Sequence, residues 1–199
     1  MVRWKKGGEE GFMKVIILFI VAYLIGNLLT AHFVSRLLYK GNIHDVGSGN
    51  AGARNAGRMF GKKAFIFTFL GDAAKGAAVI IAAKCFGFSL TVQLFALLGV
   101  ILGHLFPVFF RFKGGKGMST FAGGMLSCQP LLFAVLLVLF IPFYLISRSL
   151  TIGALGAIAS IPFVMIFFSY KPVIIFIGAL ISFFIILSHR HNIKEKILK

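Results

Sequence analysis

The stretch VIILFIVAYLIGNLL, from Val15 to Leu29, contains no charged residue, and apolar residues dominate as far as Leu38. A helix needs about 20 apolar residues to cross the hydrocarbon core of a bilayer, so this run is long enough to span a membrane. Lysines precede it, as they do in a secretion signal. Because the run is long and several more follow, we interpret Val15–Leu38 as a first transmembrane helix and not as a cleaved leader.

The composition of the whole chain also indicates a membrane protein. Of its 199 residues, 59% are hydrophobic, and the mean hydropathy is +0.96. Soluble domains have roughly 45–50% apolar residues. Cys85 and Cys128 form no CxxC pair, which argues against a disulfide framework or a zinc site. We therefore predict an all-α integral membrane protein in which residues 1–199 form one domain.

Six further crossings are predicted from the remaining apolar runs. Proline inside a helix removes a hydrogen bond, so Gln129-Pro130 is expected to divide residues 121–147 into two short or tilted helices. The other predicted crossings are Ala64–Cys85, Leu90–Phe110, Ile152–Tyr170 and Pro172–Ser188.

Basic residues are dispersed between the apolar runs. Lys and Arg total 21 against 5 Asp and Glu, a formal charge of +16. Dispersed charge of this kind suits anionic lipid headgroups or anionic substrates better than nucleic acid. It gathers in residues 40–63, in residues 111–120, near Arg148 and in the tail, which the positive-inside rule assigns to the cytoplasm. These assignments require about seven crossings, with the amino terminus outside and the carboxyl terminus inside.

Two polar segments are rich in glycine. The first, GSGNAGARNAGR (Gly47–Arg58), offers backbone amides that can curl around an anion, together with two arginines. The second, RFKGGKGMST (Arg111–Thr120), places Lys113 and Lys116 among glycines. A plain anchor to lipid headgroups would need the lysines but not the glycines, so we expect both segments to bind phosphate groups.

Other polar residues lie within or directly after the apolar runs. Asp72 and Lys75 share one face of a predicted helix, and we interpret them as a structural ion pair in the bundle interior. A role in positioning the site is the alternative. His189 and Asn192 follow the last run, where histidine can transfer protons and both can bond substrate hydroxyls. His104 is expected to be structural.

Taken together, these segments resemble the bacterial acyl-phosphate:glycerol-3-phosphate acyltransferases of the PlsY type. The first family motif is approximately GSGNPGATNxxR, and the second, approximately GHxFPVFxxFKGGKGxAT, matches Gly103–Thr120 almost throughout. The buried DxxKG and the HRxNI of the tail also match. The chain departs from the family pattern at two positions of the first motif and through most of the third: Ala51 replaces Pro, Arg54 replaces Thr, and of the third motif, approximately RYSSLAS, only Arg148 is kept, with Thr151 as a hydroxyl replacement.

The resemblance implies a seven-helix enzyme of the bacterial cell membrane, with its site facing the cytoplasm. It transfers a fatty acyl group from acyl phosphate to glycerol 3-phosphate, giving lysophosphatidic acid without a metal or other cofactor. Membrane lipids surround it, and no obligatory protein partner is implied. The residues implied to bind acyl phosphate are Ser48, Gly49, Asn50, Gly52 and Asn55. Those implied to bind glycerol 3-phosphate are Arg58, Lys116, Thr151, His189 and Asn192. Of these, His189, Lys116 and Arg58 are expected to be catalytic.

The reaction would be attack of a hydroxyl on a mixed carboxylic–phosphoric anhydride. Phosphate is a good leaving group, so the main tasks are positioning and charge stabilisation. Either His189 or a phosphate oxygen takes the proton. A transporter of organic phosphates or other anions is an alternative, although the chain lacks the paired repeats common in transporters. A structural membrane subunit with degenerate motifs is a third possibility.

Overall fold

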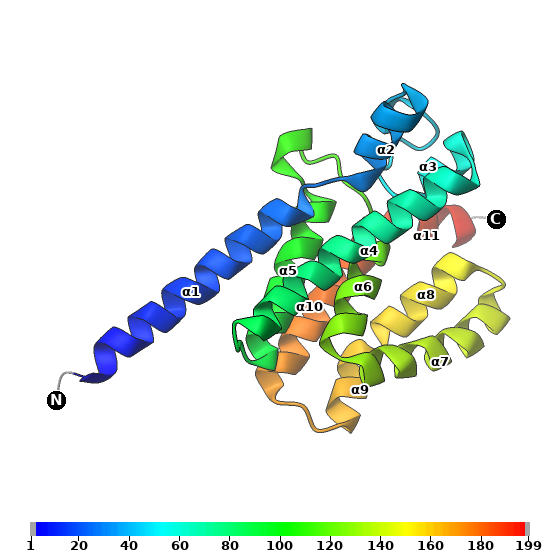
Figure 1. Cartoon of the computed structure of the whole chain (residues 1–199). Coiled ribbons are helices and arrows are strands. Elements are labelled where there is room, and N and C mark those ends of the chain that lie inside the picture. Colours follow the sequence, from blue (N-terminus) through cyan, green and yellow to red (C-terminus); the bar gives the residue numbers. More distant parts are fainter. Residues whose placement is uncertain (1–2, 198–199) are drawn as a thin grey trace.

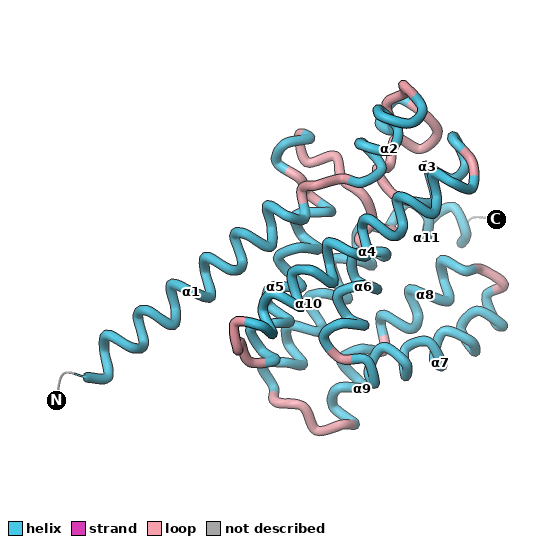
Figure 2. The backbone as a smooth tube through the Cα atoms, in the orientation of Figure 1, coloured by secondary structure: helices cyan, strands magenta, loops and turns pink. Residues whose placement is uncertain are grey.

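The computed structural model describes residues 3–197 of the chain, with the side chains of residues 11–193. This part is all-helical, as Figures 1 and 2 show. Its α-helices are α1 (Arg3–Gly26), α2 (Thr30–Tyr39), α3 (Ala53–Phe60), α4 (Lys62–Cys85), α5 (Leu90–Leu105), α6 (Met118–Cys128), α7 (Pro130–Ser147), α8 (Leu150–Ala159), α9 (Ile161–Phe167), α10 (Pro172–Ser188) and α11 (Arg190–Ile197).

Among the described residues, 5 helical stretches are long and apolar enough to cross a membrane. They are Gly11–Tyr39, Lys62–Cys85, Leu90–Phe110, Pro130–Ser147 and Leu150–Phe167. The apolar helix α10 is slightly shorter. The fold is therefore that of an integral membrane protein built from helices.

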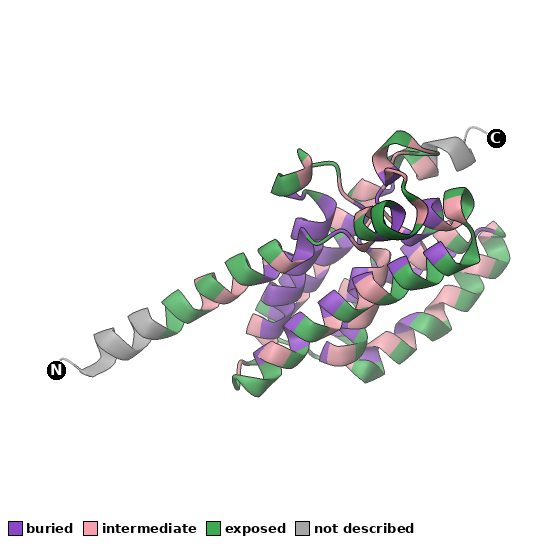
Figure 3. Ribbon diagram, turned by 45° about the horizontal axis from the view of Figure 1, so that its top comes forward, coloured by how far each residue is buried: buried purple, intermediate pink, exposed green. Residues whose placement is uncertain are grey.

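Helix α5 forms the centre of the bundle and is buried over most of its length (Figure 3). Its glycines allow close packing against α1, since a β-carbon at Gly103 would lie only 2.0 Å from the Tyr23 carbonyl oxygen. Helices α4 and α6 approach equally closely, because a β-carbon at Gly76 would lie 2.1 Å from the Thr120 carbonyl oxygen. Small residues at such crossings let helices pack closely in a bilayer, where no hydrophobic effect drives helices together.

The first predicted span is not one continuous helix, so the prediction of a single helix over Val15–Leu38 is wrong. Helix α1 ends at Gly26 and α2 starts at Thr30. The side-chain amide of Asn27 donates a 2.7 Å hydrogen bond to the Tyr23 carbonyl. The Nζ atom of Lys75 donates to the carbonyls of Gly26 (3.0 Å) and Leu28 (2.7 Å). A backbone break inside a membrane protein persists where other groups satisfy its polar atoms, and a lysine from α4 does so here.

Two further breaks occur along the chain. The break predicted at Gln129-Pro130 is present, because α6 ends at Cys128 and α7 begins at Pro130. The run Ile152–Tyr170, expected as one helix, is divided at Ser160 into α8 and α9. The hydroxyl of Ser160 donates to the Gly156 carbonyl at 3.0 Å, and Pro162 lies at the start of α9. Proline tolerates this first turn because its missing N–H is not needed there.

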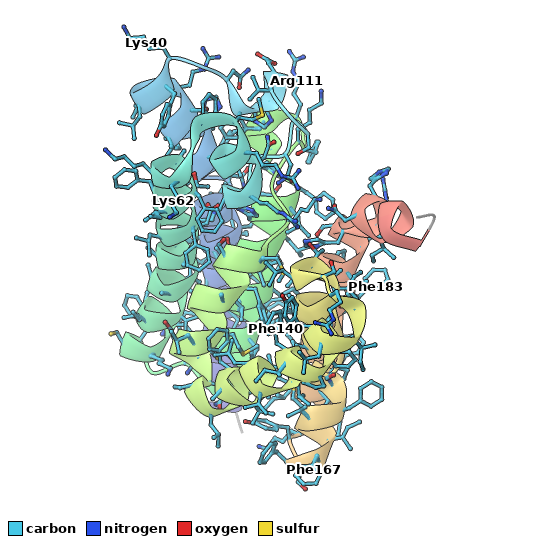
Figure 4. The ribbon with its side chains drawn as sticks, turned by 90° about the vertical axis from the view of Figure 1, so that its right-hand side faces the viewer. Lys40, Lys62, Arg111, Phe140, Phe167 and Phe183 are labelled. Carbon is cyan, nitrogen blue, oxygen red and sulfur yellow. The ribbon has the colours of Figure 1, made fainter. Side chains whose placement is uncertain are left out.

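The polar segments gather at one end of the bundle, as Figure 1 shows for α2, α3, α11 and the segment joining α5 to α6. Figure 4 places Lys40, Lys62 and Arg111 toward this end and Phe167 at the opposite end. Residues 40–63, one of the segments in which basic residues gather, contain the helix α3. The two ends of the chain lie at opposite ends of the molecule (Figure 1).

Candidate active site

The first glycine-rich segment forms a tight loop that leads into α3. Gly47 (φ +59°) and Gly49 (φ +67°) adopt left-handed conformations, which glycine takes without steric cost. The Asn55 side chain holds this loop: its Oδ1 accepts from the Ser48 amide at 3.1 Å, and its Nδ2 donates to the Val46 carbonyl at 3.1 Å. Asn55 is buried. Both ends of its side-chain amide therefore serve the loop, whereas the sequence suggested a contact with substrate.

Helix α3 follows this loop and carries two arginines, Arg54 and Arg58. Gly52 is its N-cap residue, with an extended backbone. The first N–H groups of any helix lack carbonyl partners within the helix, which makes its N-terminus attractive to anions. Arg54 and Arg58 are exposed and four residues apart, so they share one face of α3.

The second glycine-rich segment packs against the end of α5 and touches the first. The Gly115 amide donates to the His104 carbonyl at 3.0 Å, and the Ala51 amide donates to the Gly114 carbonyl at 3.4 Å. A β-carbon at Gly115 would lie 2.1 Å from His104 Nε2. The following helix α6 has only 11 residues, about 16 Å of rise. Gly115 and Gly117 are buried, so this segment enters the bundle before α6 begins.

A buried polar cluster lies beneath the second segment. The Nζ atom of Lys75 is 3.1 Å from Asp72 Oδ1 and donates to His104 Nδ1 at 2.8 Å. Because Nδ1 accepts this bond, the proton of the neutral His104 ring sits on Nε2. The same lysine bonds the carbonyls at the break between α1 and α2. The cluster thus connects that break to the backbone of the second glycine-rich segment.

The tail contributes the third group of site residues. Lys116 Nζ bonds Asn192 Oδ1, which joins the second segment to α11. The Ser188 hydroxyl also donates to the Lys116 carbonyl at 3.2 Å. His189 caps the end of α10 and is 5% exposed.

His189 is held in a defined tautomer. Its Nδ1 is 2.8 Å from the Ile185 carbonyl, which can only accept, so Nδ1 carries the proton and Nε2 the lone pair. Burial lowers the pKa of His189 to about 4, with the charges of Lys116 and Arg54 acting in the same direction and the bond to Ile185 opposing them. The side chain is therefore a neutral imidazole at physiological pH, able to accept a hydrogen bond through Nε2.

Helix α8 reaches the site through a contact that sequence reasoning did not anticipate. Arg54 Nη1 donates to Thr151 Oγ1 at 2.5 Å. The structure therefore brings Arg54, Thr151, Lys116, His189 and Asn192 into one region. In the sequence, Arg54 stands out only as a departure from the family motif. Its position within that motif was the one indication that it lies in the site.

Arg58 lies at the edge of this region. With Arg54, Lys62 and Phe65 it lines an open hollow of about 330 Å³ between α3 and α4. Asp72 takes part in every ion pair that joins two of the described side chains, residues 11–193. The same part of the chain has no group of three or more His, Cys, Asp or Glu side chains that could hold a metal. The site is therefore rich in cations and backbone amides, which suits the binding of phosphate and the stabilisation of negative charge.

The chain is similar in sequence and fold to known glycerol-3-phosphate acyltransferases. The sequence profile of the glycerol-3-phosphate acyltransferase family matches residues 16–199. Glycerol-3-phosphate acyltransferase 1 of Bacillus cereus is 48% identical over 171 residues, covering 86% of this chain and 94% of its own. The corresponding protein of Desulfitobacterium hafniense is 33% identical and covers 98% of this chain and 96% of its own.

Solved structures give the same result. The crystal structure of PlsY (YgiH), an integral membrane glycerol 3-phosphate acyltransferase, in its glycerol 3-phosphate form, superposes with a TM-score of 0.82 at 32% identity, covering 93% of this chain and 92% of that one. Its lysophosphatidic acid form gives a TM-score of 0.80 at 33% identity, with the same coverage. The chain belongs to the glycerol-3-phosphate acyltransferase family.

Proposed function

We propose that this protein transfers a fatty acyl group from acyl phosphate to the hydroxyl of glycerol 3-phosphate, giving lysophosphatidic acid and inorganic phosphate. The proposal rests on one observation: the two glycine-rich segments contact each other in one region of the molecule. The same region contains the hydrogen-bonded pairs Lys116–Asn192 and Arg54–Thr151 and the neutral His189. Both substrates carry phosphate, and this region supplies cations and amides from four separate segments.

In the proposed division of the site, the donor phosphate lies at the loop of Ser48, Gly49 and Asn50 and at Gly52, the first turn of α3. Asn55 supports this loop through its hydrogen bonds to Ser48 and Val46. The acceptor lies against Lys116, Asn192 and His189, with Thr151 and Arg58 on the side of α3 and α8. Asp72 and Lys75 act as a structural pair that holds the second segment in place. Positioning the two reactants in this way is the main source of rate for a reaction with a good leaving group.

The chemistry balances without a further reactant. The acceptor oxygen forms a bond to the acyl carbon, the bond from that carbon to the phosphate oxygen breaks, and the hydroxyl proton goes to the departing phosphate. His189 Nε2 accepts a hydrogen bond from the hydroxyl and orients it for attack. Its lowered pKa makes it a weaker base than phosphate, so we assign it orientation rather than final possession of the proton. Lys116 and Arg58 stabilise the developing negative charge.

We further propose that the whole chain is a single unit with seven crossings, made by α1, α4, α5, α6, α7, α8 with α9, and α10. An odd number agrees with termini at opposite ends of the molecule (Figure 1). The basic polar end would face the cytoplasm of a bacterial cell. Water-soluble glycerol 3-phosphate would reach the site from this side, while the acyl chain of the donor would lie among the helices.

The test is acyl transfer by purified protein in detergent, supplied with an acyl phosphate and glycerol 3-phosphate. Lysophosphatidic acid and phosphate should form in equal amounts, and EDTA should have no effect. Folded protein that forms no product would refute the proposal. Flux of glycerol 3-phosphate into sealed vesicles without acyl transfer would indicate a transporter instead.

A further inference from the structure

His104, near the end of α5, is a buried histidine that the proposed division of the site leaves without a role. It is 2% exposed. The Lys75 ammonium can only donate, so Nδ1 of His104 accepts the 2.8 Å hydrogen bond between them and Nε2 carries the ring proton. The Asp72 carboxylate lies on the same side of the ring, with Oδ1 3.7 Å from Nδ1. Asp72 and Lys75 thereby fix which nitrogen of His104 presents a proton.

In the part of the chain that the structure describes, the proton on Nε2 has no hydrogen-bond acceptor. The side-chain hydrogen bond of His104 is made by Nδ1 alone. Buried polar groups are almost always hydrogen-bonded, and a buried donor that stays unsatisfied destabilises the protein. The Nε2–H group is therefore free to donate to a ligand.

This N–H group lies where the two glycine-rich segments meet. A β-carbon at Gly115 would lie 2.1 Å from His104 Nε2 and 3.0 Å from the Ala51 carbonyl oxygen. Ala51 belongs to the first segment, whose loop is proposed to hold the donor phosphate. Gly115 directly precedes Lys116, which is proposed to hold the acceptor. The acyl group passes from one substrate to the other, so its carbonyl must react near this contact.

We infer that His104 is a catalytic hydrogen-bond donor, whose Nε2–H binds the carbonyl oxygen of the acyl donor. The inference rests on the proposed function and deepens it. As the hydroxyl oxygen bonds to the carbonyl carbon, the π electrons of the carbonyl move to its oxygen, which becomes an oxyanion. They return when the bond to the phosphate oxygen breaks, and the hydroxyl proton goes to the departing phosphate. His104 neither gains nor loses a proton.

A neutral imidazole held in this way suits the task. A positioned donor aimed at an oxygen that becomes negative binds the transition state more tightly than the ground state. The N–H of a neutral ring can polarise a carbonyl without giving up its proton. Because Lys75 donates to Nδ1 of the same ring, it makes Nε2–H a stronger donor. Gly115 has no side chain that would cover Nε2.

The first experiment compares steady-state kinetics and thermal unfolding of wild type, His104→Asn, His104→Gln and Gln93→Leu. The amide oxygen of asparagine can accept from Lys75 in place of Nδ1, but asparagine leaves no donor at the position of Nε2. The longer glutamine can place an amide N–H there. Gln93 is the matched control, because it is a buried polar residue near the other end of α5 and donates to the Phe88 carbonyl at 2.8 Å.

His104→Asn should lower kcat by about 100-fold, the loss expected when one oxyanion donor is removed, while each KM stays within about threefold of wild type. His104→Gln should be about tenfold faster than His104→Asn, because it restores a donor. Gln93→Leu should melt at a lower temperature but keep the kcat of wild type. A kcat of folded His104→Asn within about tenfold of wild type would overturn the inference. So would a loss confined to KM, or an equal fall in kcat in Gln93→Leu.

A second readout uses the wild-type protein and needs no turnover. The probe is an acyl phosphonate in which a methylene group replaces the oxygen between the carbonyl carbon and phosphorus, so that the carbonyl is kept but cannot be transferred. In the NMR spectrum of protein with isotope-labelled histidine in detergent, the probe should move the Nε2–H resonance of His104 downfield, and inorganic phosphate alone should not. An unmoved resonance, or an equal shift with inorganic phosphate, would overturn the inference. Failure of wild type to form lysophosphatidic acid would instead refute the proposed function.

Discussion

Replacing Lys75 with methionine tests how the buried cluster supports the fold. Lys75 is within 3.1 Å of Asp72, bonds His104 at 2.8 Å and satisfies the carbonyls of Gly26 and Leu28. Methionine keeps a long unbranched side chain but removes the charge and all four contacts. Asp72 would then be a buried carboxylate without its cation, and two carbonyls at the break between α1 and α2 would lose their donor.

The expected cost is large because one member of a buried pair remains. Removing one partner of a buried ion pair costs about 3–5 kcal/mol. Leaving a buried polar group such as a carbonyl unsatisfied costs about 1–3 kcal/mol. The cost of breaking the ion pair already includes part of this loss. For a chain of this length, the corresponding drop in melting temperature is on the order of 10 °C.

The assay is thermal unfolding in detergent, with Lys84→Met as the matched control. Lys84 lies on the same helix but is exposed and donates one 2.6 Å bond to the Ser127 carbonyl, so its replacement should cost about 0.5 kcal/mol. The double variant Asp72→Asn, Lys75→Met removes the stranded charge and should recover part of the loss. If Lys75→Met melts like Lys84→Met, or if the double variant is no more stable than the single one, the buried cluster does not support the fold as argued.

Three other predictions concern the site itself. In the acyl-transfer assay, Lys116→Ala and Arg58→Ala should each raise the KM for glycerol 3-phosphate by about tenfold, because each removes a charge-assisted contact. Full activity of both variants would show that these residues are not part of the site. His189 has a folded pKa of about 4 against 6.5 when unfolded, so its contribution to stability is complete above pH 6.5 and declines by about 3 kcal/mol as the pH falls to 4. Denaturation of wild type and His189→Gln across this range should show that pH dependence only in wild type. Gly115→Ala would place a β-carbon 2.1 Å from His104 Nε2, so lysophosphatidic acid formation should fall at least tenfold, and wild-type rates would show that the segment moves freely.

The apolar spans could be predicted from the sequence because a membrane-spanning helix needs a continuous run of apolar residues. A run of about 20 apolar residues has few alternatives to a membrane helix. The break at Gln129-Pro130 was predictable for the same local reason, since proline cannot continue a helix hydrogen bond. The break after Gly26 was not, because its carbonyls are satisfied by Lys75, 47–49 residues further along. Breaks stabilised by distant side chains leave no local signal.

The site was predicted less evenly than the fold. The two glycine-rich segments do touch, through Ala51 and Gly114. Asn55 is polar and adjacent to the predicted ligands, yet its amide serves the loop backbone, a role that only the three-dimensional arrangement reveals. Arg54 was treated as a deviation, because nothing in the sequence shows that α8 supplies Thr151 beside it.

The placement of acidic residues explains how the site stays cationic. Two phosphate-bearing substrates would be repelled by a carboxylate, and repulsion between like charges in a low-dielectric environment is strong. Asp72 avoids this by lying inside the bundle, where it neutralises Lys75. That neutralised lysine can then bond His104, whose backbone carbonyl accepts from Gly115. The buried carboxylate of Asp72 thus supports the second glycine-rich segment from below, while Arg54 and the first turn of α3 lie at the region proposed to bind the phosphates.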